Sequence, residues 1–495
     1  MQPATALENI SKDVANMIAT PTTEGALFQK IQERLVKQFE TSFPDKLAPK
    51  TVVIIPSLTM DEEILSKVSG ITHYEERMLC LLLLLRMPRT NVVYVTSMPI
   101  DPIIIDYYLH LLPGVTGYHA QQRLTLLSCY DASPKPLTQK ILERPRLIER
   151  IKKSIQQGHG NDTHLAMFNV TPLERTLALK LDMPIFGCDP DLFELGNKSN
   201  GRKIFRECGL LVPDGYEDLH TEVDIADALH KLKTKYPALK KAVVKMNDGF
   251  SGDGNGVFYF TGNEIEQSRE QIQRSLLHRL KLVATDLSYE IFLQKFASMG
   301  GVVEIFVEGE IKASPSVQCR INPVGECGVV STHDQELGGE TGQIFIGAHF
   351  PAHPDYAPEL GRIGKAIAKN MEQKGVLGRF AVDFISVKEE GVWKHYAIEI
   401  NLRKGGTTHP YIMLEFLTDG VYDVEQGIYH TATGQERFYF SSDNLKSDKY
   451  IGTTPHDLID IAMLHNLQYD GALQEGVMFH LVGGCRCITA KQLMY

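Results

Sequence analysis

Short apolar runs alternate with helix-like segments between residues 51 and 188, and this alternation limits the fold more than any other feature of the sequence. The apolar runs are Val52–Pro56, Val92–Thr96, Leu124–Cys129 and His164–Val170, with Pro184–Cys188 as a further candidate. Helical patterns lie at 1–45, 73–86, 102–112 and 137–157. Strands that alternate with helices form mostly parallel sheets covered by helices. We therefore predict a parallel α/β domain over residues 1–193. No GxGxxG motif follows any of these strands, so we expect no cofactor in this domain.

A different pattern begins at about residue 194. A helix at 198–208 ends at Gly209, and the strand-like run Ala242–Met246 leads into a Gly-rich loop. Further strands are expected at 289–320, Arg379–Ser386 and Trp393–Asn401, with a helix at 357–373. This mixture predicts a two-lobed α+β domain over 194–425, with lobes at about 194–295 and 296–425. A C-terminal segment, 426–495, follows, with Glu475–Val482 as one strand candidate.

The composition excludes several classes of partner. The net charge is −10, without the basic surplus or basic stripe of a nucleic-acid-binding protein, so no nucleic-acid partner is expected. The most apolar run, Met78–Leu85, is far shorter than the roughly 20 residues that cross a bilayer, so no membrane partner is expected. The 8 cysteines form no CxxC pair, and the N-terminus lacks the pattern of a signal peptide. These features favour reduced thiols and a cytoplasmic location.

Asp383, Glu399 and Asn401 are the strongest local signal for a metal site. Glu399 and Asn401 lie two positions apart in a strand-like run, so their side chains share one face. Asp383 lies in the preceding run, and 389–391 reads as a hairpin turn that brings it opposite the other two. Three oxygen ligands on one face suit Mg²⁺ together with water and nucleotide phosphates. The alternative, a solvated polar face, fits less well because flanking isoleucines predict a half-buried strand, where an unpaired carboxylate is costly.

The residues after Asn401 combine a positive charge with a glycine pair. Arg403 lies two positions beyond Asn401 and is expected on the same face. Gly405, Gly406 and Thr407 then expose backbone N–H groups, which can hold an oxyanion or a carboxylate. The alternative is an ordinary Gly-rich turn.

Lys245 near the end of a strand-like run precedes a second Gly-rich loop. Glycines let backbone N–H groups approach phosphates closely, and the lysine supplies a positive charge. The loop is not a Walker A motif, because no GK[ST] closes it. The alternative is a mobile hairpin tip. The loop residues expected at the phosphates are Gly249, Ser251, Gly252 and Gly254.

Another apolar run, 290–296, ends in Gln294, Lys295 and Phe296 and is followed by Glu304. A strand that ends in a polar pair and then Phe can form a hinge for a flat base. Glu304 can accept hydrogen bonds from ribose hydroxyls. By themselves these residues also read as a plain strand.

Taken in this order, the motifs resemble the ATP-grasp superfamily over about 194–420. The helix at 198–208, followed by 209–213, is similar to the opening segment of that family, which implies that Lys198 and Lys245 are its two nucleotide lysines. The resemblance implies an adenine hinge at 294–297 and a ribose contact at Glu304. It also implies that Asp383, Glu399 and Asn401 hold magnesium, and that Arg403 acts at an acyl-phosphate step.

A closer likeness, carried by 331–335, 378–384 and 399–410, is to ATP-grasp peptide ligases of the pheganomycin-maturation type and the related module of animal IQ-motif-containing protein H. The stretches 51–57 and 90–99 are similar to the Rossmann-like pre-ATP-grasp domain of that group. No IQ-type basic helix is found in the sequence. The segment 426–495 is expected to be a shortened form of the group's C-terminal part.

The resemblance implies ATP and Mg²⁺ as cofactors and an ADP-forming carboxylate–amine ligase, which makes an amide or peptide bond through an acyl phosphate. Its partners would be small-molecule or peptide carboxylates and amines, with a homodimer as a candidate assembly. Candidate contacts to substrate are His333, Arg320, Thr407 and His409. A structural role for His333 and a solvated strand face for Arg320 are the alternatives. The alternative function is a catalytically weak or inactive nucleotide-binding module in a larger assembly.

Overall fold

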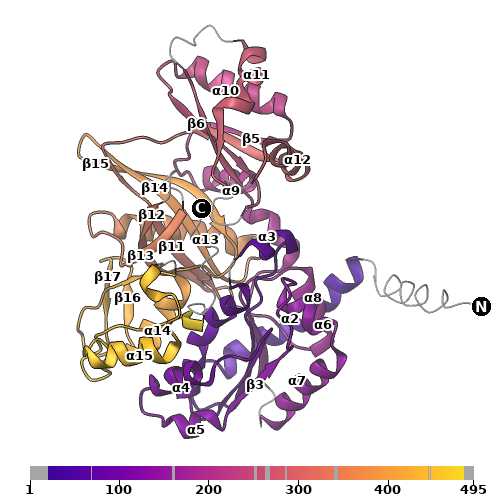
Figure 1. Cartoon of the computed structure of the whole chain (residues 1–495), viewed down its shortest axis with the longest axis vertical. Helices are drawn as coiled ribbons and strands as arrows, with labels where there is room; N and C mark the ends of the chain where they lie inside the picture. The colour runs from indigo at the N-terminus through magenta and orange to yellow at the C-terminus, as the bar shows by residue number, and fades with distance from the viewer. Residues whose placement is uncertain are drawn as a thin grey trace, which may run out of the picture. The chain divides into compact units, whose positions relative to one another are not determined.

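The computed structural model describes residues 21–68, 70–158, 162–249, 254–261, 268–284, 287–338, 344–443, 445 and 447–483. They form two compact units (Figure 1), one containing the chain up to Pro190 together with the chain from Ile451, the other containing Asp191–Tyr450. The expected C-terminal segment 426–495 is thus divided between the two units. No helix of the described residues is long and apolar enough to cross a membrane.

The first unit is built on a parallel sheet in the order β3-β2-β1-β4. Its strands are β1 (Lys50–Ile55), β2 (Thr90–Thr96), β3 (Leu124–Ser128) and β4 (Asp162–Met167). Pro184–Cys188, the further strand candidate, contributes one parallel bridge, between Ile185 and Leu165 of β4. The predicted parallel α/β class of this part is therefore confirmed.

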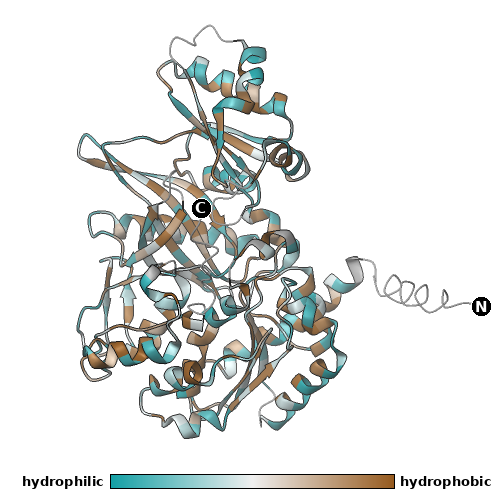
Figure 2. Cartoon of the chain, viewed as in Figure 1, coloured by the Kyte–Doolittle hydropathy of each residue, from teal (hydrophilic) through white to brown (hydrophobic). Residues whose placement is uncertain are grey.

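Helices cover this sheet, and their apolar residues form the core with the strands. They are α2 (Pro21–Thr41), α3 (Glu62–Lys67), the 3₁₀ helix η1 (Ile71–Arg86), α4 (Pro102–His110), α5 (Gly117–Gln121), α6 (Leu137–Leu142), α7 (Pro145–Gln157) and α8 (Pro172–Leu181). Figure 2 shows both hydrophilic and hydrophobic residues on α7, which buries Leu147, Ile148 and Ile151. The predicted single helix at 137–157 is divided into α6 and α7, because Pro145 has no N–H to donate and starts a new helix.

The chain returns to the first unit after residue 450. Helix α15 (Pro455–Leu464) packs on α4, and the Phe479 N–H donates to the Tyr107 hydroxyl at 2.9 Å. The Gly483 N–H donates to Glu76 at 3.0 Å. The strand predicted at 475–482 is wrong: in its place the described residues make isolated bridges, such as Val477 to Gln468.

The second unit begins at Asp191, within the 3₁₀ helix η2 (Pro190–Gly196). Its first sheet is antiparallel, in the order β5-β9-β6-β7-β8. The strands are β5 (Gly215–Leu219), β6 (Lys241–Met246), β7 (Asn255–Tyr259), β8 (Leu280–Leu282) and β9 (Gly301–Ile305). The accompanying helices are α9 (Lys198–Glu207), α10 (Glu222–Lys235), α11 (Arg269–Arg279) and α12 (Tyr289–Met299). This sheet, with α10, α11 and α12, encloses its own apolar core.

Helix α12 corrects a prediction, because its residues were expected to form a strand. The Ser288 side chain caps the helix by accepting from the Ile291 N–H at 3.3 Å. Phe292 and Phe296 lie four positions apart and are both fully buried in the core. The spacing of the two phenylalanines fits a helix, where residues four apart share a face. The four-residue period was not recognised in the sequence because the apolar run 290–296 also fits a strand.

A larger antiparallel sheet follows, in the order β10-β14-β11-β12-β13-β18, with β15 also paired to β14. Its strands are β10 (Ile311–Ala313), β11 (Pro315–Ile321), β12 (Cys327–Gly338), β13 (Ile344–Phe350), β14 (Gly378–Glu389), β15 (Val392–Asn401) and β18 (Tyr439–Ser441). The remaining elements are α13 (Ala357–Gln373), α14 (Thr408–Thr418), β16 (Val421–Asp423), β17 (Ile428–His430) and the 3₁₀ helix η4 (Asp448–Tyr450). The predicted α+β class of this part is confirmed.

Helix α13 packs closely on β11 and β12. A Cβ on Gly364 would lie 2.5 Å from Val317 Cγ1 and 2.8 Å from Val329 Cγ2, so glycine is required for the close approach. The buried face of α13 supports the middle of the sheet, from which the candidate site residues of β14 and β15 project.

Candidate active site

Strands β14 and β15 form the hairpin that the sequence predicted. Asp383 pairs with Glu399 and Ala381 with Asn401, and the turn between the strands has positive φ angles at Glu390 and Gly391. Residues directly opposite each other in a hairpin lie on one face, as do residues two positions apart in a strand, so this register puts Asp383, Glu399 and Asn401 on the same face. The structure therefore brings the three predicted oxygen ligands together.

Hydrogen bonds fix the Asp383 carboxylate at the centre of this group. The Asn401 amide donates to Asp383 Oδ2 at 2.9 Å, and the Gln335 amide donates to Oδ1 at 2.8 Å. Burial and the negative charge of Glu399 raise the pKa of Asp383 to about 6. Two carboxylates held so close need a positive charge near them.

Three cations supply that charge. Lys198, the first residue of α9, lies with its Nζ 3.3 Å from Glu399 Oε1. Burial acts to raise the pKa of Glu399, but nearby positive charges hold that pKa below its ordinary value. These charges are, from the strongest effect to the weakest, those of Lys198, Arg403 and Lys245. Residues from three separate parts of the sequence thus act on one carboxylate.

Hydrogen bonds to Asn247 hold Lys198 near Lys245. The Asn247 side chain accepts from the Ser199 N–H at 3.0 Å and from its hydroxyl at 2.7 Å, and the backbone carbonyl of Asn247 accepts from the Lys198 N–H at 3.2 Å. The Asn247 amide also donates to the Met299 carbonyl at 2.9 Å. These contacts tie the start of α9 to the end of β6. Sequence reasoning missed this residue, although its place two positions after Lys245 was a signal.

Lys245 and Glu304 form a buried ion pair on the neighbouring strands β6 and β9. Arg202 binds the other oxygen of Glu304 at 2.8 Å and also contacts Glu217 at 3.1 Å. Glu304 is only 3% exposed and Lys245 7%. Sequence reasoning assigned Lys245 and Glu304 to phosphate and ribose separately and missed Arg202. In the structure they form one charged cluster.

The structure places Gln294, Lys295 and Phe296 on α12, so the predicted hinge strand is wrong. Phe296 is buried in the core of its lobe and cannot present a face to a base. The chain passes from the smaller sheet to the larger one between the end of β9 and the start of β10, at 306–310. This crossing begins two residues after Glu304.

Side-chain hydrogen bonds from Gln318 hold the loop that precedes α14. The Gln318 amide donates to Thr407 Oγ1 at 2.7 Å, and the Thr408 hydroxyl donates to Gln318 Oε1 at 3.2 Å. The Gly405 N–H donates to Thr408 Oγ1 at 3.0 Å and is therefore engaged within the loop. A Cβ on Gly405 would meet no atom within 4 Å, so this glycine borders open space.

The candidate substrate contacts differ in their surroundings. His333 is fully buried, its Nε2 is 3.0 Å from the Tyr439 hydroxyl, and its ring packs against Phe350. Burial lowers the pKa of His333 to about 3, which keeps it neutral. His409 is also buried, in the first turn of α14. Arg320 is exposed and pairs with Arg379, toward the opposite end of β11 from the Ser316–Asp383 pair.

The second Gly-rich loop is described only in part. Gly249 and Gly254 flank it, with a Cβ on Gly249 reaching 3.2 Å from the Gly254 nitrogen. Ser251 and Gly252 lie outside the described residues. The Met246 N–H donates to the Gly254 carbonyl at 2.9 Å, so the flanks come together as a hairpin base.

The donor set fits magnesium. Asp383 and Glu399 offer carboxylate oxygens and Asn401 an amide oxygen, which are the hard ligands that Mg²⁺ prefers. Among the described residues, no group of three or more His, Cys, Asp or Glu side chains is arranged to hold a metal. The set here depends on the amide of Asn401 and leaves coordination positions for water and phosphate.

Residues 263–425 match the family model described as "IQCH-like, ATP-grasp". L-propargylglycine–L-glutamate ligase of Streptantibioticus cattleyicolor is 28% identical over 440 residues, which is 88% of this chain and 87% of that protein. IQ motif-containing protein H of Danio rerio is 22% identical over 404 residues, or 72% of this chain and 38% of that protein.

Among solved structures, a biotin carboxylase from Campylobacter jejuni is similar with a TM-score of 0.47 and 13% identity, covering 77% of this chain and 70% of that one. The match to the family model includes Glu304, Asp383 and Glu399. These findings bear out the predicted resemblance to the ATP-grasp superfamily.

Proposed function

We propose that the protein is an ATP- and Mg²⁺-dependent, ADP-forming carboxylate–amine ligase. The observation that carries this proposal is the convergence of Lys198, Lys245 and Arg403 on Glu399, which itself faces Asp383. Phosphoryl transfer is catalysed mainly by positioning and by neutralising charge on phosphate oxygens. A cluster of fixed cations beside a divalent-metal ligand set meets both needs.

The reaction has two steps. An oxygen of the substrate carboxylate attacks the γ-phosphorus of ATP, the bond to the β-phosphate oxygen breaks, and ADP leaves. The amine nitrogen then attacks the acyl carbon, inorganic phosphate leaves, and the amine loses a proton. The acyl phosphate is the intermediate that links ATP cleavage to amide formation.

We assign the residues of this unit to separate parts of the reaction. Lys198 and Lys245 bind phosphate oxygens of ATP, and Glu304 together with the crossing at 306–310 binds the nucleoside. Arg403, Gly406 and Thr407 lie beside the attacking carboxylate. Asp383, Glu399 and Asn401 would hold Mg²⁺, which when bound neutralises charge on the phosphates.

The similarity to the ligase of Streptantibioticus cattleyicolor guides the choice of substrates. That protein is named for joining L-propargylglycine to L-glutamate. We propose that this chain also joins amino acids or peptides, with one supplying the carboxylate and another the amine. A cytoplasmic location and a homodimer belong to the same proposal.

The test is ADP release from ATP with Mg²⁺ and pairs of L-amino acids, with the products identified by mass spectrometry. We expect one ADP and one phosphate to be released for each new amide bond that forms. The alternative function, a nucleotide-binding module without turnover, predicts ATP binding but no ADP above the level of a Glu399→Ala variant. The presence of every predicted oxygen ligand on one face favours the enzyme.

A further inference from the structure

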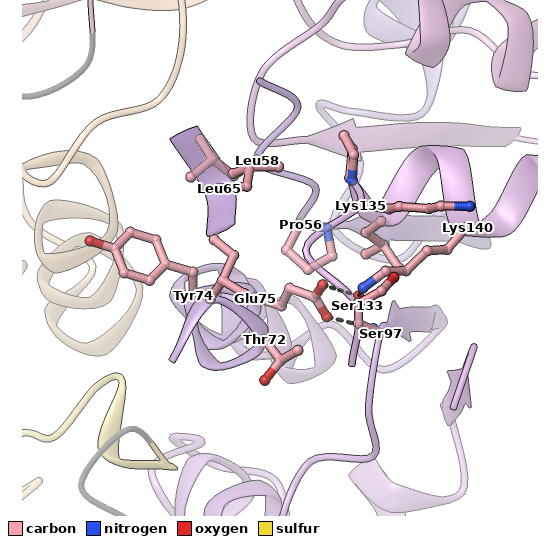
Figure 3. A pocket seen from close by; sticks show the side chains of 13 residues that line it. Pro56, Leu58, Leu65, Thr72, Tyr74, Glu75, Ser97, Ser133, Lys135 and Lys140 are labelled. Carbon is pink, nitrogen blue, oxygen red and sulfur yellow. Dashed lines mark hydrogen bonds between the residues drawn. The ribbon is translucent and has the colours of Figure 1, made fainter. Parts of the chain in front are cut away.

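A pocket in the first unit is too small for a substrate (Figure 3). It has room for about one water molecule. The Ser97 hydroxyl donates to Glu75 at 2.5 Å and accepts from the Lys140 ammonium at 2.9 Å. Lys135 pairs with Glu143 at 3.1 Å. The charged groups of this pocket therefore bind one another, and the amine of the proposed reaction has to bind elsewhere.

An apolar pair of side chains lies on the same face of the larger sheet as Asp383. Gln335 of β12 donates to Asp383 at 2.8 Å, and Leu337 lies two positions further along that strand. A β-bulge between Glu336 and Leu337 sets Phe345 of β13 directly opposite Leu337. Residues two apart in a strand share one face, as do residues directly opposite each other on neighbouring strands. Leu337 and Phe345 therefore extend the face of the candidate site with apolar side chains.

Phe345 reaches the loop that we assign to the attacking carboxylate. A Cβ on Gly406 would lie 3.1 Å from Phe345 Cε1, so the ring covers one side of this glycine. A Cβ on Gly405 would meet no described atom within 4 Å, so the loop is open there. Leu337 is 38% exposed, which leaves part of the apolar pair accessible to a bound molecule. The pair thus lies beside the place where the acyl phosphate would form.

Asp443 brings a negative charge to the same glycine. The same Cβ on Gly406 would lie 3.7 Å from Asp443 Oδ2. Strand β18 pairs with β13, and directly after β18 the Ser442 hydroxyl donates to the Ile346 carbonyl at 2.6 Å. These contacts carry the chain along β13 and fix the approach of Asp443 to the loop. A carboxylate accepts several hydrogen bonds at once, so it can hold an ammonium group.

An amine with an apolar side chain fits this arrangement. The α-amino group of an amino acid or peptide is mostly an ammonium at pH 7. Its side chain is attached to the carbon that carries the nitrogen. With the nitrogen at Asp443, the side chain would contact Leu337 and Phe345, and the nitrogen would lie next to the loop at Gly406, where it has to reach the acyl carbon.

We propose that Asp443 binds the ammonium group of the amine substrate and that Leu337 and Phe345 contact its apolar side chain. The proposal rests on the proposed ligase function and names the class of its amine, an amino acid or peptide whose first residue is apolar. Asp443 brings the nitrogen to the acyl phosphate, and the apolar pair selects the side chain.

The experiment is isothermal titration calorimetry of the full chain with L-leucinamide, in the presence of ADP and Mg²⁺. L-leucinamide carries the ammonium and an apolar side chain but no carboxylate, so it reports on the amine site alone. We expect binding of L-leucinamide, and at least about tenfold weaker binding of 4-methylpentanamide, which lacks the ammonium. Glycinamide, which lacks the side chain, should also bind more weakly than L-leucinamide.

Asp443→Asn keeps the shape of the side chain and removes its charge. It should weaken L-leucinamide binding at least about tenfold, as for loss of a charge-assisted contact. Asp227→Asn, the same substitution at a carboxylate of α10 that pairs with Lys231, is the matched control and should bind normally.

Leu337→Ser tests the apolar pair at a position where partial exposure limits the effect on folding. It should weaken L-leucinamide binding about fourfold, as for loss of one buried CH₂ group, and leave glycinamide binding unchanged. Leu277→Ser, at a leucine of α11 that is 52% exposed, is the matched control. Thermal melting of each variant checks its fold.

Three results would each overturn the proposal: no binding of L-leucinamide to the parent chain, equal affinity of Asp443→Asn and the parent chain, or an equal loss of glycinamide binding in Leu337→Ser. The ligase function fails by a different result. Binding of L-leucinamide as described, in a chain that releases no ADP with any carboxylate and amine, would overturn the ligase function and not the amine site.

Discussion

The ammonium of Lys198 lies 3.3 Å from Glu399 Oε1, although 201 residues separate them in the sequence. Helix α9, which begins at Lys198, packs on β15, which carries Glu399. The approach also needs Gly196, where a Cβ would lie 3.1 Å from Leu402 Cγ and 3.3 Å from the Ile400 carbonyl oxygen. The contact brings the proposed nucleotide lysine next to one of the proposed metal ligands.

Replacing Lys198 with Met should therefore weaken ATP binding. The substitution keeps the length of the side chain and removes the charge, at a contact worth about 1.5–3 kcal/mol for a charge-assisted hydrogen bond. We expect a rise in the Kd of ATP of about 10- to 100-fold by calorimetry. Lys203→Met, on the same helix but exposed and paired with Asp218, is the matched control. Equal affinities of the two variants would show that Lys198 does not contact nucleotide.

The metal assignment predicts a change in magnesium dependence. Two acids and an amide are a weak cage alone, so Asp383, Glu399 and Asn401 should bind Mg²⁺ only together with nucleotide. In Glu399→Ala, ATP affinity should lose most of its dependence on added Mg²⁺, measured by titrating ATP with and without the metal. A variant that kept the full magnesium response would place the metal elsewhere.

Short-range patterns predicted the hairpin well. The side-chain alternation of β14 and β15 and the turn at Glu390 and Gly391 are local features, so the pairing of Asp383 with Glu399 could be read from the sequence. Helix α13 was also predicted with its observed bounds, 357–373, because its apolar residues keep the helical period.

Features that depend on distant residues were not predictable in this way. The apolar run of α12 fits both a strand and a helix, and only the packing of Phe292 and Phe296 into the core decides between them. The ion cluster of Lys245, Glu304 and Arg202 joins residues of β6, β9 and α9, so no local spacing in the sequence predicts it. The two contacts of Gln335 and Gln318 with site residues have the same cause.

His333 predicts a specific loss of stability in acid. Its pKa in the folded chain is lowered to about 3, below the ordinary value of 6.5, because burial disfavours the charged ring. Below pH 6.5 the unfolded chain therefore binds a proton that the folded chain does not, and stability falls as the pH falls toward 3. The effect approaches about 2.7 kcal/mol at pH 4.5, from 1.36 kcal/mol per pH unit.

The measurement is the melting temperature from pH 7.5 to 4.5 for the parent chain and His333→Gln. The variant should be less stable at pH 7.5, since it loses ring packing against Phe350, but its stability should fall less on acidification. His349→Gln, at a histidine whose side chain is 53% exposed, should follow the parent chain. A His333→Gln curve parallel to that of the parent would mean that His333 is protonated in the folded state.

Lys245 and Arg403 should differ in the step that each supports. Lys245 ends beside the Gly-rich loop and is already held by Glu304, so it should meet phosphate oxygens present in bound ATP. Arg403 follows the proposed metal ligands, and its backbone N–H donates to the Asn401 carbonyl at 2.8 Å, so we propose that it acts at the reacting end of ATP. A contact made equally in the ground and transition states lowers KM, whereas one made mainly in the transition state raises kcat.

Lys245→Met should therefore raise the Kd of ATP by about 10- to 100-fold, corresponding to about 1.5–3 kcal/mol. Arg403→Ala should leave ATP binding nearly unchanged and lower kcat by about 10²–10³, as for loss of one oxyanion donor. Arg362→Ala, at an exposed position of α13, is the matched arginine control and should change neither quantity. Lys245→Met leaves Glu304 with Arg202 as its partner, so a melting curve must accompany it. Normal turnover in Arg403→Ala together with a collapse of ATP binding would reverse the orientation of ATP that we propose, because Arg403 would then contact the nucleotide and not the acyl group.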